Sequence, residues 1–241
     1  MTTDLLIFED RPSDSPLVER VWRSRSLRAG TFLSVAESRC ELVITRLRGR
    51  TFVTLRGPET RATPAQCPAE GEWLGIRLSP GTFFSAHPAA TLRDRQDMTQ
   101  PSENGRTFRL HGSAWELPDF ENAEVFVARL ARAGVLAHDA AVSAVLRGER
   151  LSLSLRSAQR HFLHATGLTL GAHQQIERAR HAARLLQQGE SIADAVHAAG
   201  YFDQAHLTRS VASLIGATPA RIRRGERQLS FLYKTGADRR A

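Results

Sequence analysis

Two short stretches of the chain carry hydrogen-bonding side chains at the spacing of one helix face. They are Arg156, Gln159 and Arg160 in the first stretch, and Gln204, His206, Thr208 and Arg209 in the second. In the major groove of DNA, arginine pairs with the edge of guanine and glutamine with the edge of adenine. The chemistry that both stretches offer is therefore recognition of base edges.

The second stretch lies in a segment whose local signals predict three helices. Ser191 is a helix N-cap, and Asp194, three residues on, completes a capping box. Gly200 ends this first helix. Its apolar stripe consists of small residues at helical spacing, namely Ile192, Ala195, Val196 and Ala199.

Asp203 caps the next helix, which Gly216 ends, and Thr218 followed by Pro219 opens the third. The buried face of the middle helix is expected to consist of Leu207, Val211, Leu214 and Ile215. A helix that packs through alanines beneath a second helix with polar outward side chains is typical of a helix-turn-helix.

The upstream segment predicts a second copy of this unit. Asp139 caps a helix that ends near Gly148, and Ser154 caps a helix that Gly167 ends. The inward side chains are expected to be Val142, Val145 and Leu146 in the first helix, and Leu155, Ala158 and Phe162 in the second. From Thr169 to Gly189, a longer helix is expected to join the two units as a rigid spacer, with Leu170, Ile176, Ala179, Ala183 and Leu186 at helical spacing.

Two such units joined by one helix, ending in GYFDQAHLTRS and IGATPARI, resemble the DNA-binding domain of the AraC/XylS transcriptional regulators. The resemblance covers roughly residues 137–226. It implies that base contacts come from Arg156, Gln159 and Arg160 in one groove, and from Gln204, Ala205, His206 and Arg209 in the next.

The chain departs from the family pattern at three places. Ala158 stands where the family usually has leucine, and Val211 where it usually has phenylalanine. Ala212 and Ser213 replace a usual basic pair. Because a smaller core residue supports its helix less firmly, we expect the first recognition helix to be the weaker of the two.

The N-terminal part has a different pattern. Residues 42–65 and 71–84 alternate apolar and polar side chains, with turns at Gly49 and at Gly57–Pro58. This predicts short strands in a small β-barrel or sandwich. Residues 15–117 also resemble the cupin-like sensor half of some members of the family, which implies a ligand-binding or protein-interaction domain.

The predicted fold is thus α+β with two domains. A β-rich, cupin-like effector or interaction domain is expected over residues 1–118, followed by an interdomain helix over 119–136 that Asp119 caps. An all-α domain over 137–228 contains the two helix-turn-helix units and their linker helix. Residues 229–241 are expected to be a flexible tail.

The charge of the chain is uneven. The net charge is +8, but residues 1–120 hold 16 basic and 15 acidic side chains, whereas residues 121–241 hold 17 and 10. The basic excess therefore lies where phosphate contacts are expected. Codon bias is an alternative cause of the high arginine content, because the chain has 32 arginines and a single lysine. No signal peptide and no apolar run of eighteen residues is found, so we expect a cytoplasmic bacterial protein.

Catalytic and cofactor sites find little support. The phosphate-binding, nucleophile-elbow and zinc-protease motifs are missing from the sequence, so we expect neither an enzyme nor a cofactor. His87 and His111 are too few for a cupin metal centre, and His161 and His164 form a weak pair. Most histidines are expected to be solvated or to face phosphate. Cys40 and Cys67 are either buried thiols or a redox pair. Trp22, Trp73 and Trp115 either belong to the core or line a ligand pocket.

These observations predict a sequence-specific transcriptional regulator that binds double-stranded DNA at two adjacent major-groove half-sites. A ligand or partner would act through the N-terminal domain. RNA polymerase, a small-molecule effector and a second copy of the chain stay open as further partners, and no membrane is expected. The alternatives are a degenerate relative that acts through protein–protein contacts and a cupin-type enzyme fused to a DNA-binding domain.

Overall fold

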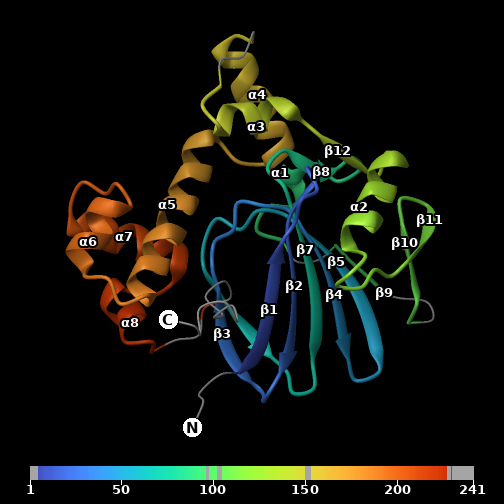
Figure 1. Ribbon diagram of the computed structural model, residues 1–241, viewed down its shortest axis with the longest axis horizontal. Coiled ribbons are helices and arrows are strands. Elements are labelled where there is room, and N and C mark those ends of the chain that lie inside the picture. Colours follow the sequence, from blue (N-terminus) through green and yellow to red (C-terminus); the bar gives the residue numbers. More distant parts are fainter. Residues whose placement is uncertain (1–4, 96–97, 102–104, 150–152, 227–228, 230–241) are drawn as a thin grey trace.

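The computed structural model describes residues 5–95, 98–101, 105–149, 153–226 and 229 (Figure 1). Strands occupy most of the described chain up to residue 116, and the chain is predominantly helical from residue 140 onward. The predicted α+β division into a β-rich N-terminal part with antiparallel sheets and a helical C-terminal part is confirmed.

The largest sheet has six antiparallel strands in the order β1-β2-β7-β4-β5-β9. These strands are β1 (Leu6–Pro12), β2 (Val18–Ser26), β7 (Glu72–Leu78), β4 (Glu41–Leu47), β5 (Arg50–Arg56) and β9 (Met98–Pro101). The hairpin between β4 and β5 turns at Arg48 and Gly49, where the sequence predicts a turn. In this hairpin Ile44 lies opposite Val53, and both side chains point into the core.

Three two-stranded ribbons accompany this sheet. They pair β3 (Gly30–Ser34) with β6 (Thr63–Cys67), β8 (Thr82–Phe84) with β12 (Leu136–His138), and β10 (Thr107–Leu110) with β11 (Ser113–Glu116). The pairing of β12 with β8 brings the chain back to the β-rich part immediately before the helical part begins.

Two helices complete the core of the β-rich part, namely α1 (Ala89–Leu92) and α2 (Ala123–Arg132). Helix α2 is shorter than the helix predicted over residues 119–136, and its buried face packs into this core. Asp119 does not cap it, since its carboxylate accepts hydrogen bonds from the backbone N–H groups of Glu121 and Asn122 in the preceding turn. Trp115 also belongs to this core, and its indole N–H donates to the carbonyl of Leu110.

The remaining helices are α3 (Ala140–Leu146), α4 (Leu155–Thr166), α5 (Leu170–Gln187), α6 (Ile192–Ala198), α7 (Gln204–Ile215) and α8 (Pro219–Arg223). In Figure 1, α5 runs from α3 and α4 at the top to α6, α7 and α8 at the left. Across the described ranges, no helix has the length and apolar character needed to cross a membrane.

The β-rich and helical parts share a hydrophobic core. Leu33 and Val35, in and just after β3, are buried among side chains of α5, α6 and α7. The predicted tail 229–241 lies outside the described residues except for Leu229, which is buried and forms a β-bridge with Leu33. The helical part therefore folds against the N-terminal part rather than apart from it.

Candidate nucleic-acid interface

The first helix-turn-helix unit consists of α3 and α4. The Asp139 carboxylate accepts from the backbone N–H of Ala141 at the start of α3, and the Ser154 hydroxyl accepts from that of Ser157 at the start of α4. Phe162 is 1% exposed and packs with Val142 of α3. The local caps thus place the two helices where the sequence predicts them.

The outward face of α4 presents its polar side chains to solvent. Arg156, Gln159 and Arg160 are all exposed, and the Arg160 guanidinium donates to the Ser157 hydroxyl over 3.2 Å. Leu155 does not point into the core as expected, since it is 75% exposed. It lies about 10 Å along the helix axis from the buried Phe162, beyond the packed part of the unit.

The second unit consists of α6 and α7. The Ser191 hydroxyl accepts from the backbone N–H of Asp194, and the Asp203 carboxylate accepts from that of His206. Between the helices, the Tyr201 hydroxyl lies 2.9 Å from the Ser210 hydroxyl. The fully buried or nearly buried apolar side chains of the unit are Ala195, Val196, Ala199, Leu207, Val211 and Ile215.

On the outward face of α7, Gln204, Ala205 and Arg209 are exposed. His206 is half-buried because its ring packs edge-on against Tyr201, with centroids 5.0 Å apart. Within the described ranges, no hydrogen bond or ion pair engages the side chains of Gln204 or Arg209, or those of Arg156 and Gln159 on α4. These groups are free to bind a ligand.

The start of α8 departs from expectation. Thr218 occupies the N-cap position and Pro219 the first turn, but the Thr218 side chain makes no capping hydrogen bond. The fixed φ of the proline favours the helix start at this position without such a bond. Nearby, Ala212 and Ser213 are exposed on α7.

Helix α5 joins the two units through eighteen residues, which span about 27 Å. The Thr169 hydroxyl caps it by accepting from the backbone N–H of Ala172. Its buried stripe includes Ile176, Ala179, Ala183 and Leu186, as the sequence predicts. A single packed helix therefore fixes the separation of the units.

The C-terminal ends of both outward helices contact the β-rich part through a glycine. Gly167 ends α4 at a φ of 70°, and a Cβ there would lie 2.7 Å from the backbone of Ala89. Gly216 ends α7 at a φ of 79°, and a Cβ there would lie 2.8 Å from the Cβ of Ala62. Each position thus needs glycine for both its backbone conformation and its close approach.

Hydrogen bonds reinforce both contacts. At the first unit, the Ser143 hydroxyl donates to the carbonyl of Pro80, and Arg93 donates to the carbonyl of Gly167. At the second unit, the backbone N–H of Ala36 donates to the carbonyl of Leu214, near the end of α7, over 2.8 Å. The β-rich part therefore contacts both outward helices at the ends opposite to their caps.

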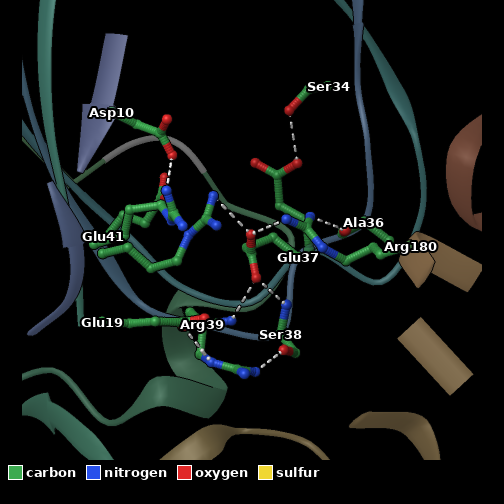
Figure 2. Close-up of polar contacts among 12 residues, drawn as sticks. Asp10, Glu19, Ser34, Ala36, Glu37, Ser38, Arg39, Glu41 and Arg180 are labelled. Carbon is green, nitrogen blue, oxygen red and sulfur yellow. Dashed lines mark hydrogen bonds and ion pairs between the residues drawn. The ribbon is translucent and has the colours of Figure 1, made fainter. Parts of the chain in front are cut away.

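A buried charge cluster lies beside this second contact (Figure 2). The Glu37 carboxylate lies 2.9 Å from the Arg180 guanidinium on α5 and 3.0 Å from that of Arg77 on β7. Arg180 also donates to the carbonyl of Ala36. Burial alone would raise the pKa of Glu37, but the charges of Arg180, Arg77 and Arg39 outweigh it and lower that pKa to about 2. The carboxylate is therefore ionised in the folded protein.

A second contact of this loop lies one turn away on α5. The Ser38 hydroxyl donates to the Glu177 carboxylate over 2.5 Å, and the Arg39 guanidinium lies 3.3 Å from the same carboxylate. Loop 36–39 thus contacts α5 at both Glu177 and Arg180. This cluster was not predicted from the sequence: Arg180 falls four residues after the buried Ile176, a spacing that places it on the inward face of α5 but does not identify Glu37 as its partner.

Of the histidines expected to be solvated, His173 is buried, whereas His164 is exposed and His161 is half-buried. His161 pairs with the Asp139 carboxylate at 2.6 Å, and His164 packs edge-on against Phe83. His173 is buried against Phe162, and its Nδ1 has no hydrogen-bond partner among the described residues. Burial is the main cause that lowers the pKa of His173 to about 4.

The other candidate groups occupy structural positions. Cys40 and Cys67 are both free and buried, and burial raises the pKa of each thiol. Trp22 stacks on Phe8, with ring centroids 5.7 Å apart. Among the residues that the structure describes, no group of three or more histidine, cysteine or acidic side chains is placed to hold a metal ion.

One of the comparisons with known proteins agrees with this geometry. Residues 148–225 match a family model described as a helix-turn-helix domain. No curated protein matches the sequence. One solved structure, an apo form of a ToxT variant from Vibrio cholerae strain SCE256, is 6% identical, with a TM-score of 0.32 over 90% of this chain and 96% of that one. That likeness is too remote to support an argument. The match of residues 148–225 agrees with an AraC-type helix-turn-helix, and it supports a DNA-binding transcriptional regulator.

Proposed function

We propose that the chain binds a specific, non-palindromic DNA site through α4 and α7 together. The observation that carries this proposal is the presence of two exposed polar faces on helices joined by one packed helix. Adjacent major grooves on one face of DNA are about 34 Å apart. The proposed base contacts come from Arg156, Gln159 and Arg160 in one half-site, and from Gln204, Ala205, His206 and Arg209 in the other.

The two parts of the chain, with the boundaries predicted from the sequence, are proposed to have different functions. Residues 137–228 bind DNA, and residues 1–118 form the part through which a ligand or a protein partner acts. Helix α2 connects them and packs with the N-terminal core. An effector that favours one arrangement of the N-terminal part would shift the population of DNA-binding geometries.

The contact of loop 36–39 with α5 and α7 supports this coupling. Because the loop holds Arg180 by charge and Leu214 by a backbone hydrogen bond, its displacement would remove two restraints on the second unit. The first unit is held independently through Gly167 and Ala89. A change at the loop would therefore alter the position of α7 relative to α4.

The small cavity at this interface is not proposed as the effector site. It lies between Cys40, Thr82, Thr166 and His173, and has room for about one water molecule. An effector of ordinary size would need a different site or a different arrangement of the two parts.

The test compares DNA affinity and half-site spacing in the full-length wild type and in Glu37→Gln. After a preferred site is selected, one base pair is inserted or removed between its halves. We expect the wild type to bind one spacing best, because α5 and loop 36–39 fix the separation of α4 and α7. Glu37→Gln should lose affinity for that spacing and discriminate less among spacings.

The matched control is Glu9→Gln, which removes an ion pair with Arg23 at an exposed place on the sheet. It should bind like the wild type. A folded Glu37→Gln variant that retains the wild-type affinity and spacing preference would exclude coupling through the loop. A wild-type protein that binds no DNA sequence would instead favour the alternative of a degenerate protein-interaction relative.

A further inference from the structure

The two most exposed large apolar side chains among the described residues both lie where an outward helix begins. Phe202 is 91% exposed and Leu155 is 75% exposed. Single apolar side chains on a surface need no explanation. These two, however, both lie within one residue of the N-cap of an outward helix: Phe202 immediately precedes the Asp203 cap of α7, and Leu155 immediately follows the Ser154 cap of α4.

The backbone that carries Phe202 is firmly held. Its neighbour Tyr201 is buried, and the Tyr201 hydroxyl pairs with Ser210 of α7. Arg178 of α5 donates to the carbonyl of Gly200, and its guanidinium lies over the Tyr201 ring, 5.3 Å from the centroid. The phenyl ring therefore projects into solvent from a fixed turn, so that little backbone ordering is needed for it to make a contact.

The place of this ring indicates what covers it. In a helix-turn-helix, residues at the N-terminal end of the second helix contact base edges in the major groove. Gln204 and Ala205, which follow the Asp203 cap, are exposed at this same end. The apolar group that the major groove offers at base edges is the 5-methyl group of thymine, which accepts contacts from apolar side chains.

We propose that Phe202 packs against the 5-methyl group of a thymine in the half-site bound by α7, and that Leu155 does the same in the half-site bound by α4. Each side chain thereby determines specificity for thymine over cytosine at one position. This inference rests on the proposed function, because it requires that α4 and α7 enter the groove. It adds one further contact to the base contacts proposed for each helix.

The test uses thymine-to-uracil replacement, which removes the 5-methyl group and leaves the hydrogen-bonding edge unchanged. A preferred site is selected from a random DNA pool with the full-length wild type. Each thymine is then replaced singly by uracil, and affinity is measured by fluorescence anisotropy. For the wild type, one replacement in each half-site should weaken binding about three- to fivefold, the value of one buried methyl group.

The variants assign each methyl group to its side chain. Phe202→Ala should bind thymine and uracil equally at one position of the α7 half-site, while it retains discrimination in the other half-site. Leu155→Ala should show the reverse. Val125→Ala removes a side chain of α2 that is 61% exposed, and should discriminate like the wild type in both half-sites.

Three outcomes would overturn the proposal. If no uracil replacement weakens wild-type binding, no methyl contact exists. If Phe202→Ala and Leu155→Ala retain the discrimination, other residues make the contact, and the exposed apolar side chains would serve a protein partner instead. If the wild type binds no member of the pool, the proposed function itself fails and this inference falls with it.

Discussion

The carboxylate of Glu37 and the guanidinium of Arg180 form an ion pair 2.9 Å long between the β-rich part and α5, with side chains only 12% and 8% exposed. Removal of one member of a buried ion pair is costly, because it leaves the other charge buried without its partner. The pair is therefore a junction at which the loss of either member affects both parts of the molecule.

We expect Glu37→Ala to lower the free energy of unfolding by about 3–5 kcal/mol, because it leaves the Arg180 charge buried without its carboxylate. The double variant Glu37→Leu/Arg180→Met should lose less than Glu37→Ala, since no charge of the pair then remains. Urea unfolding followed by fluorescence checks this order. Glu9→Gln, at an exposed ion pair, should cost less than about 1 kcal/mol. A double variant less stable than Glu37→Ala would contradict the account.

Base contacts by α7 can be tested directly. Arg209→Ala and Gln204→Ala should each lower affinity for the preferred site by about 1–3 kcal/mol and relax preference at one base pair, because a lost base contact removes discrimination there. Binding isotherms on the preferred site and on its single-base variants measure both effects. Arg132→Ala on α2 serves as the control. Equal weakening on all sequences would show that these side chains contact phosphate instead.

The two outward helices, α4 and α7, differ in how deeply their inward side chains are buried. Ala158 on α4 is half-buried, whereas Val211 on α7 is fully buried. We expect Ala158→Leu to raise both the free energy of unfolding and the DNA affinity, by about 1 kcal/mol, and Arg156→Ala to weaken binding less than Arg209→Ala. Ala212→Leu, at an exposed position on α7, should give no gain. A destabilised Ala158→Leu variant would mean that the site is already filled.

The burial of His173 predicts a pH dependence. Its pKa is lowered from 6.5 to about 4 in the folded state, so the unfolded chain binds a proton more readily between these values. The free energy of unfolding should therefore include the full contribution of His173 above about pH 6.5. It should fall by about 3 kcal/mol in total as the pH decreases toward 4. Unfolding free energies of the wild type and His173→Leu between pH 4 and 8 measure this. An unchanged slope in the variant would assign the effect to other groups.

Local signals explain why much of the helical part could be predicted. Caps such as Ser154 and Asp203, and terminal glycines such as Gly167 and Gly216, act through backbone hydrogen bonds within a few residues, and each of them marks an observed helix end. The hairpin turn at Gly49 is local in the same way.

The remaining features depend on contacts between distant segments. Leu155 fits the helical period of Phe162, yet it is exposed because the packed part of the unit ends before it. The Asp119 carboxylate bonds within its own turn instead of capping α2. The pairing of Glu37 with Arg180 has no sequence spacing that marks it, since the fold alone brings loop 36–39 onto α5. Periodicity therefore predicts which face of a helix is apolar, and tertiary packing decides how much of that face is covered.

The most direct test of the account is selection of bound sequences from a random double-stranded DNA pool by the full-length protein, followed by affinity measurements at several salt concentrations. The full chain is needed because Leu33 and Val35 complete the core beneath α5 and α7. We predict two conserved half-sites about one helical turn apart, with an affinity that falls steeply as salt increases through counterion release. Enrichment of no sequence, or an affinity independent of salt, would contradict DNA recognition by α4 and α7.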